Sequence, residues 1–212
     1  MKKYIALLMA SALAISVNAK SLRELWTSMP DSILPVLDKN MCLEMVELMD
    51  MGVKPEVKNL LGENCVMDTL TSDFLQVATS EASSLQLKLL PQDSGDSILC
   101  VVKTFLAPEK ESEVAFYNQA WQVIDATRCL DESIASVDSY FQSKPDTMRD
   151  ERYQELMASL EPKMFYAELS PKENSIIYHV STPLVTKEEK TQLQALVLQR
   201  KFNWDGERFK KN

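Results

Sequence analysis

The chain contains two related stretches, Ser97-Ile-Leu-Cys-Val-Val-Lys-Thr-Phe-Leu-Ala-Pro-Glu-Lys-Glu111 and Ser175-Ile-Ile-Tyr-His-Val-Ser-Thr-Pro-Leu-Val-Thr-Lys-Glu-Glu189, which align at an offset of 78 residues with six of fifteen positions identical. Apolar residues alternate in both, which is typical of a β-strand. Each stretch follows another strand-like segment and a polar turn, so each is expected to form half of a β-hairpin. The similarity predicts an internal duplication. The alternative is that any two hairpins share this pattern.

Helix-like sequence precedes each hairpin. In the first half, Ser21 is placed to cap a short helix, and Leu37, Met41, Met45 and Leu48 follow at helical spacing. This spacing predicts a longer helix with one buried stripe.

The second half repeats the order of helices and then strands. Asp131 and Asp146 are placed to cap two helices, and Thr186 and Glu189 form a capping box that opens a further short one. Additional strand-like segments are Phe74 to Ala78, Glu113 to Trp121 and Leu193 to Trp204.

These patterns predict an α+β fold, in which two αα-ββββ repeats form an antiparallel sheet with helices packed on one face. The first helix-plus-meander half would span residues 20–125 and the second residues 126–212. The other face of the sheet would be free to contact a partner.

The first nineteen residues have the features of a secretory signal peptide. Lys2 and Lys3 precede an apolar run of 14 residues, and Ala19 ends a sequence suited to signal peptidase. The run is shorter than the ~20 residues that a membrane-spanning helix needs. We expect cleavage after Ala19, no membrane span and a soluble periplasmic protein.

The chain is acidic, with 31 Asp and Glu against 23 Lys and Arg, a formal net charge of −8. Removing Lys2 and Lys3 leaves 21 basic residues and a charge of 21 − 31 = −10. Such a charge repels phosphate backbones and anionic lipid headgroups, which disfavours nucleic-acid binding and a membrane-surface role.

The mature chain, from Ser21-Leu-Arg-Glu-Leu-Trp-Thr-Ser-Met-Pro30 to Phe202-Asn-Trp-Asp-Gly-Glu-Arg-Phe209, resembles an uncharacterised exported family of Gram-negative gut anaerobes that carries a domain-of-unknown-function label. Its duplicated plan also resembles the β-lactamase-inhibitor-protein-like fold shared by small exported PepSY-like proteins. The first resemblance implies a periplasmic location and no reaction. Neither assigns a functional residue, because a fold does not fix a function.

Four cysteines follow the signal segment, namely Cys42, Cys65, Cys100 and Cys129. Outside the cytoplasm an even number permits two disulfides, whose pairing the spacing leaves open. Four buried thiols are the alternative, since free cysteine is among the most buried residue types. There is no close His or Cys pair of the kind that zinc prefers, so no metal or other cofactor is expected.

His179 is the single histidine of the chain and lies in a strand-like segment. Nucleophilic catalysis needs a nucleophile and an orienting acid beside such a base, and no sequence pattern designates them. We therefore expect no catalysis, with no catalytic or metal-binding residue to name.

Aromatic residues are the candidates for a ligand or partner surface. Trp121 and Trp204 end corresponding strand-like segments, and Tyr117, Tyr166 and Tyr178 could enlarge an aromatic anchor on an open sheet. The leading hypothesis is a periplasmic binding or protein-interaction module without catalysis. The alternatives are a carrier of a small apolar ligand such as a lipid and, third, a hydrolase.

Overall fold

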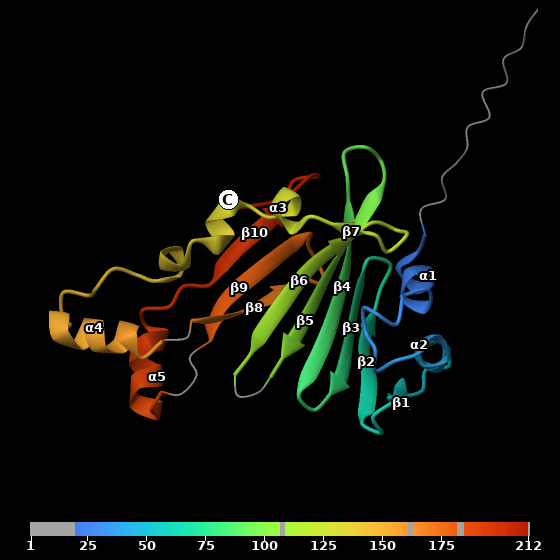
Figure 1. Ribbon diagram of the computed structural model, residues 1–212, viewed down its shortest axis with the longest axis horizontal. Coiled ribbons are helices and arrows are strands. Elements are labelled where there is room, and N and C mark those ends of the chain that lie inside the picture. The colour runs from blue at the N-terminus through green and yellow to red at the C-terminus, as the bar shows by residue number, and fades with distance from the viewer. Residues whose placement is uncertain (1–19, 107–108, 161–162, 182–184, 212) are drawn as a thin grey trace, which may run out of the picture.

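The computed structural model describes residues 20–106, 109–160, 163–181 and 185–211. It combines helices with antiparallel sheets, so the α+β class predicted from the sequence is confirmed (Figure 1). The expectation of one continuous sheet is wrong, because the described strands form two separate sheets. Among the described helices, none is long and apolar enough to cross a bilayer.

The larger sheet has seven strands that follow one another in chain order as an antiparallel meander. Its strands are β1 (Glu56–Lys58), β2 (Asn64–Leu70), β3 (Phe74–Ser80), β4 (Ser83–Pro91), β5 (Ser97–Phe105), β6 (Glu111–Tyr117) and β7 (Val123–Ile124). The smaller sheet has the strand order β11-β10-β9-β8. Its strands are β8 (Met164–Leu169), β9 (Ser175–Ser181), β10 (Arg200–Trp204) and β11 (Phe209–Lys211).

The two related stretches each begin a strand. Ser97 starts β5 and Ser175 starts β9, and each strand pairs antiparallel with the strand before it, β4 or β8. Their continuations differ, since the chain passes from β5 to β6 but from β9 to the helix α5 (Lys187–Gln194). The internal duplication therefore stays a prediction.

The helices of the first half cover one face of the larger sheet. Helix α1 (Leu22–Thr27) begins with the expected capping box between Ser21 and Glu24, and α2 (Lys39–Asp50) is capped by Asp38. Trp26 lies between them and donates from Nε1 to the Cys42 carbonyl over 2.9 Å. Leucines and valines of β3, β4 and β5 complete this helix-side core.

The smaller sheet covers the middle of the opposite face, which the sequence had suggested would be free. Phe116 of β6 and Phe209 of β11 lie 6.3 Å apart between the sheets. The edge strand β8 also bonds to the larger sheet, because the Leu169 amide donates to Gln86 Oε1 over 2.9 Å. The residues of this intersheet core are Phe74, Leu90, Ile98, Cys100, Val102, Phe116, Cys129, Ala167, Leu169, Ile176, Phe202 and Phe209.

The connection between the halves is less helical than its apolar spacing suggests. After α3 (Ala126–Cys129) come two 3-10 turns, Glu132–Ala135 and Val137–Tyr140, in place of the helix expected after Asp131. Asp131 caps the first turn by accepting from the Ser133 amide over 2.8 Å. Ser136 takes φ −77° and ψ 89°, outside the helical region, and this residue separates the two turns.

Helix α4 (Asp150–Ala158) begins later than expected, with Arg149 rather than Asp146 at its N-cap. Asp150 and Glu151 occupy its first turn, where negative charge interacts favourably with the helix dipole. Helix α5 begins at the predicted capping box of Thr186 and Glu189, but the strand expected from Leu193 starts only at Arg200.

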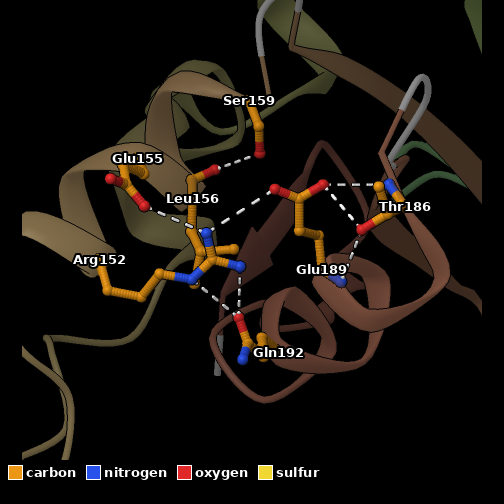
Figure 2. Close-up of polar contacts among 7 residues, drawn as sticks. All are labelled: Arg152, Glu155, Leu156, Ser159, Thr186, Glu189 and Gln192. Carbon is orange, nitrogen blue, oxygen red and sulfur yellow. Dashed lines mark hydrogen bonds and ion pairs between the residues drawn. The ribbon is translucent and has the colours of Figure 1, made fainter.

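Hydrogen bonds and an ion pair of Arg152 join α4 to α5 (Figure 2). Arg152 of α4 donates from Nη2 to Gln192 Oε1 of α5 over 2.7 Å and lies 3.8 Å from the Glu189 carboxylate. Leu156, Leu160, Leu193 and Leu196 form a small core beneath these contacts. In Figure 1 this helix pair lies at the opposite side of the molecule from α1 and α2.

The four cysteines are free, buried thiols rather than disulfides. Cys42 and Cys65 belong to the helix-side core, and Cys100 and Cys129 to the intersheet core. Burial raises the pKa of the Cys42 thiol to about 12, so this thiol is protonated at neutral pH.

Candidate functional site

The five predicted aromatic residues lie in three places rather than on one surface. On the helix side of the larger sheet, Tyr117 and Trp121 pack with ring centroids 5.6 Å apart. Trp121 is buried there, and it lies in the turn between β6 and β7 with a φ of 61°, not at the end of a strand. These two residues are mainly part of the helix-side core.

Trp204 and Tyr178 pack against the intersheet core. Trp204 ends β10 as expected, lies 5.2 Å from the Phe209 ring and donates from Nε1 to the Pro91 carbonyl over 2.6 Å. Tyr178 packs edge-on against Phe202 at 6.1 Å. Both side chains therefore hold the smaller sheet against the larger one.

Tyr166 lies apart from the other four, stacked on His179 with ring centroids 4.5 Å apart and planes inclined by 6°. Nε2 of His179 lies 3.4 Å from Glu168 Oε2 and is buried. The histidine is thus held by a carboxylate and an aromatic ring. Across the described part of the chain, no three His, Cys, Asp or Glu side chains converge as metal ligands.

The turn between β1 and β2 and the end of β5 lie at the same end of the larger sheet, its lower end in Figure 1, and both carry exposed apolar residues. Leu60 and Leu61, between β1 and β2, are 60% and 73% exposed. Phe105 and Leu106, at the end of β5, are exposed as well. We call Pro35, Val36, Leu60, Leu61, Phe105 and Leu106 the apolar end.

A groove of about 220 Å³ lies within the apolar end. Its walls are the segment 33–36 on one side and the ends of β4, β5 and β6 on the other. The Leu60 amide donates to the Val36 carbonyl over 2.9 Å, which connects the two leucines to this groove. Pro35, Val36 and Phe105 therefore line the groove, and Leu60 and Leu61 lie beside its Val36 wall.

Asn59 fixes the turn that presents the two leucines. Its buried Oδ1 accepts from the amides of Leu61 (2.9 Å) and Glu63 (3.0 Å), and its Nδ2 donates to the Thr79 carbonyl over 3.1 Å. Gly62 takes a φ of 84°, which an L side chain rarely adopts. The leucines thus sit on a turn that is held in one conformation.

The rim of the apolar end is mainly acidic. Phe105 pairs across the sheet with Ser83 and Glu111, which places it close to Glu81 and Glu113. Glu63 follows the leucines in their turn, and all four glutamates are exposed. Three lysines lie at the same end, Lys58, Lys103 and Lys110, and they are fewer than the glutamates.

Sequence reasoning missed this surface, although one signal was available. A Leu-Leu pair directly before Gly62 sits in a turn between two strands, where polar residues are expected. Phe105 gave no such signal, because it continues the apolar pattern of β5.

Comparison with known proteins gives a family and a fold. A family model described as "Protein of unknown function (DUF3256)" matches residues 14–209. A solved structure, that of a domain of an uncharacterized protein from Porphyromonas gingivalis W83, superposes with a TM-score of 0.76 at 21% sequence identity. The similarity covers 92% of this chain and 98% of that one, and at this identity it shows the shared fold. No curated protein matches the sequence.

Proposed function

The chain belongs to the DUF3256 family of proteins of unknown function. From its surface, we propose that it is an exported, non-catalytic module that binds a partner protein through the apolar end. The resemblance to the β-lactamase-inhibitor-protein-like fold and the link to gut anaerobes stay predictions.

The observation that carries this proposal is the pair Leu60 and Leu61 on a fixed turn beside an apolar groove. Contiguous exposed apolar residues with a polar rim are typical of protein-interaction sites. Because Asn59 already holds the turn, binding costs little conformational entropy there. The glutamates of the rim favour a partner that brings an apolar side chain flanked by lysines or arginines.

The dimensions of the groove favour a protein partner over a carried lipid. Its volume of about 220 Å³ is below the ~300–1,000 Å³ of most small-molecule sites. An acyl chain would remain partly exposed in such a groove, whereas one side chain of a partner protein would fill it.

The surroundings of His179 and of the cysteines support a role without catalysis. Nε2 of His179 is buried against Glu168, so it is not presented to a substrate. Burial raises the pKa of the cysteine thiols, which disfavours the thiolate that a nucleophile would need.

The apolar end can be tested by replacing Leu60 and Leu61 with aspartate. Chemical cross-linking in the periplasm of the native host should join the wild-type chain to a defined partner, and the double variant should lose at least about 90% of that product, because two charges would have to be buried in the interface. Mass spectrometry of the cross-linked band gives the measurement.

Val123→Asp is the matched control, since Val123 is 76% exposed on β7, away from the apolar end. It should leave the cross-linked product unchanged, and all variants should keep the wild-type thermal midpoint. Equal cross-linking of the wild type and the Leu60→Asp/Leu61→Asp variant would contradict the proposal.

Export of the chain and cleavage after Ala19 are a separate prediction. The full-length chain, expressed in a Gram-negative host, should be recovered from the periplasmic fraction with Lys20 as its N-terminal residue. Intact-mass spectrometry checks this. Replacing the apolar run with a segment containing two arginines should retain the protein in the cytoplasm, and recovery of uncleaved protein from the periplasm would contradict cleavage after Ala19.

A further inference from the structure

A second depression lies beside α5, where residues just before β6 meet β8 and β9. It has a volume of about 330 Å³, at the lower end of the range for small-molecule sites. At about 30 Å³ per water-sized group, this volume holds roughly ten non-hydrogen atoms. The depression therefore has room for a small metabolite.

Charged side chains of both signs line this pocket. Lys190 of α5 pairs with Glu109, with Nζ and Oε1 3.1 Å apart. Lys110 pairs with Glu168, with Nζ and Oε1 3.4 Å apart. All four side chains are about one-third to one-half exposed, and such ion pairs are weak enough for a ligand's charges to join or replace them.

Tyr166 and His179 form one wall of the pocket. Their rings are stacked, and Lys110 Nζ lies 4.9 Å above the Tyr166 ring. The interaction with His179, whose Nε2 lies 3.4 Å from Oε2, is the main cause that lowers the pKa of Glu168, so this carboxylate is charged at neutral pH. Burial, and then the charges of Glu168 and Glu109, raise the pKa of Tyr166, which stays a neutral phenol.

A smaller depression of about 130 Å³ continues from this pocket, because Lys110 and Tyr166 line both. Gln76, Gln86 and Thr104 add amide and hydroxyl groups there. The combined depression could hold the backbone charges of a ligand at one end and a polar side chain at the other.

The close pairing of Lys190 with Glu109 determines which kind of charged ligand the pocket favours. A simple anion attracted by Lys190 would meet Glu109 3.1 Å away, and a simple cation would meet the lysine in the same way. A molecule with both charges close together avoids this repulsion. In an α-amino acid the ammonium nitrogen and the carboxyl carbon are joined through one Cα and lie roughly 2.5 Å apart. Both charges of such a ligand can therefore lie beside the Lys190–Glu109 pair, whose Nζ and Oε1 are 3.1 Å apart.

We propose that this pocket binds a free α-amino acid as a zwitterion, whose carboxylate pairs with Lys190 and whose ammonium group pairs with Glu109. Val180 and Val197 of the lining contact the apolar part of the ligand. The pocket beside α5 shares no lining residue with the groove of the apolar end, although Leu106 lines the smaller depression between them.

Ligand-observed NMR with the mature chain tests the proposal, using an equimolar mixture of the twenty common amino acids. At least one zwitterion should bind with a dissociation constant below about 1 mM, a free energy near −4 kcal/mol. The N-acetyl and the amide derivatives of that ligand, which each lack one charge, should bind about tenfold to a hundredfold more weakly, the range for one charged hydrogen bond.

Two variants locate the site. Lys190→Gln should weaken binding of the zwitterion about tenfold or more, whereas Lys187→Gln, one turn earlier on α5 and outside the pocket lining, should not change it. Glu109→Gln should improve binding of the N-acetyl derivative, because it removes the repelling carboxylate. An absence of zwitterion binding, equal binding of the N-acetyl derivative, or wild-type affinity in Lys190→Gln would overturn the proposal.

Discussion

Replacing Phe202 with alanine should lower the free energy of unfolding by about 3–5 kcal/mol, the range for removing a large buried aromatic side chain. Phe202 lies at the centre of the intersheet core, is almost fully buried and packs edge-on against Tyr178. The cavity would lie between two sheets, whose backbones cannot easily close it. With a urea dependence of about 2 kcal/mol per M, the unfolding midpoint should fall by about 2 M.

The shape of this transition tests whether the two sheets form one cooperative unit. Tryptophan fluorescence and far-UV circular dichroism should give coincident urea curves for the wild type, since the intersheet core contains residues of both sheets. Lys201→Ala, at an exposed neighbouring position, is the control and should leave the midpoint almost unchanged. If the wild type instead unfolds in two steps, and Phe202→Ala shows only the second of them, the smaller sheet unfolds independently of the larger one.

The second large effect concerns a buried charge. Lys88 of β4 is 1% exposed, and its Nζ lies 2.8 Å from the half-exposed carboxylate of Asp73. Asp73→Asn keeps an acceptor for the Thr71 hydroxyl but removes the negative charge, leaving the buried ammonium without its counter-ion. We expect a loss of about 2–3 kcal/mol, somewhat less than for a fully buried pair because water reaches Asp73.

A second substitution, at Lys88, tests whether Asp73→Asn is destabilising because the charge of Lys88 is left unpaired or because the side chain at position 73 has changed. Lys88→Met/Asp73→Asn should recover most of the stability, because methionine packs beside Phe74 without a charge to satisfy. Glu173→Gln, which breaks the exposed pair with Lys201, should have no measurable effect in the same urea titration. If Asp73→Asn is as stable as the wild type, Lys88 does not depend on this carboxylate.

Local sequence signals predicted the elements that depend on local contacts. The capping boxes at Ser21 and at Thr186 are present because each needs only residues three positions apart. The hairpins β4–β5 and β8–β9 follow from alternating apolar residues on either side of a polar turn. The segment after Asp131 was wrongly expected to form a continuous helix, since apolar spacing does not show that the backbone leaves the helical region at Ser136.

The candidate surfaces could not be predicted in the same way. Tyr166 lines the charged pocket, whereas Tyr178 on the neighbouring strand packs between the sheets. In the β8–β9 register Tyr166 lies opposite His179 and Ala167 opposite Tyr178, and successive residues of a strand point to opposite faces. Lys190 and Glu109 are 81 residues apart in the chain, so their pairing depends on how α5 is placed.

By itself, the sequence determined the α+β class, most helix caps and strands, and the expectation of export, because each rests on patterns within a few residues. Only the tertiary structure decided that the strands form two sheets, that the second sheet covers the face expected to be free, and that apolar and charged surfaces lie at separate places. The physical reason is that burial between sheets is a long-range property. Which apolar face meets which depends on the packing of the whole chain, and the residues left without a partner emerge only once that packing is complete.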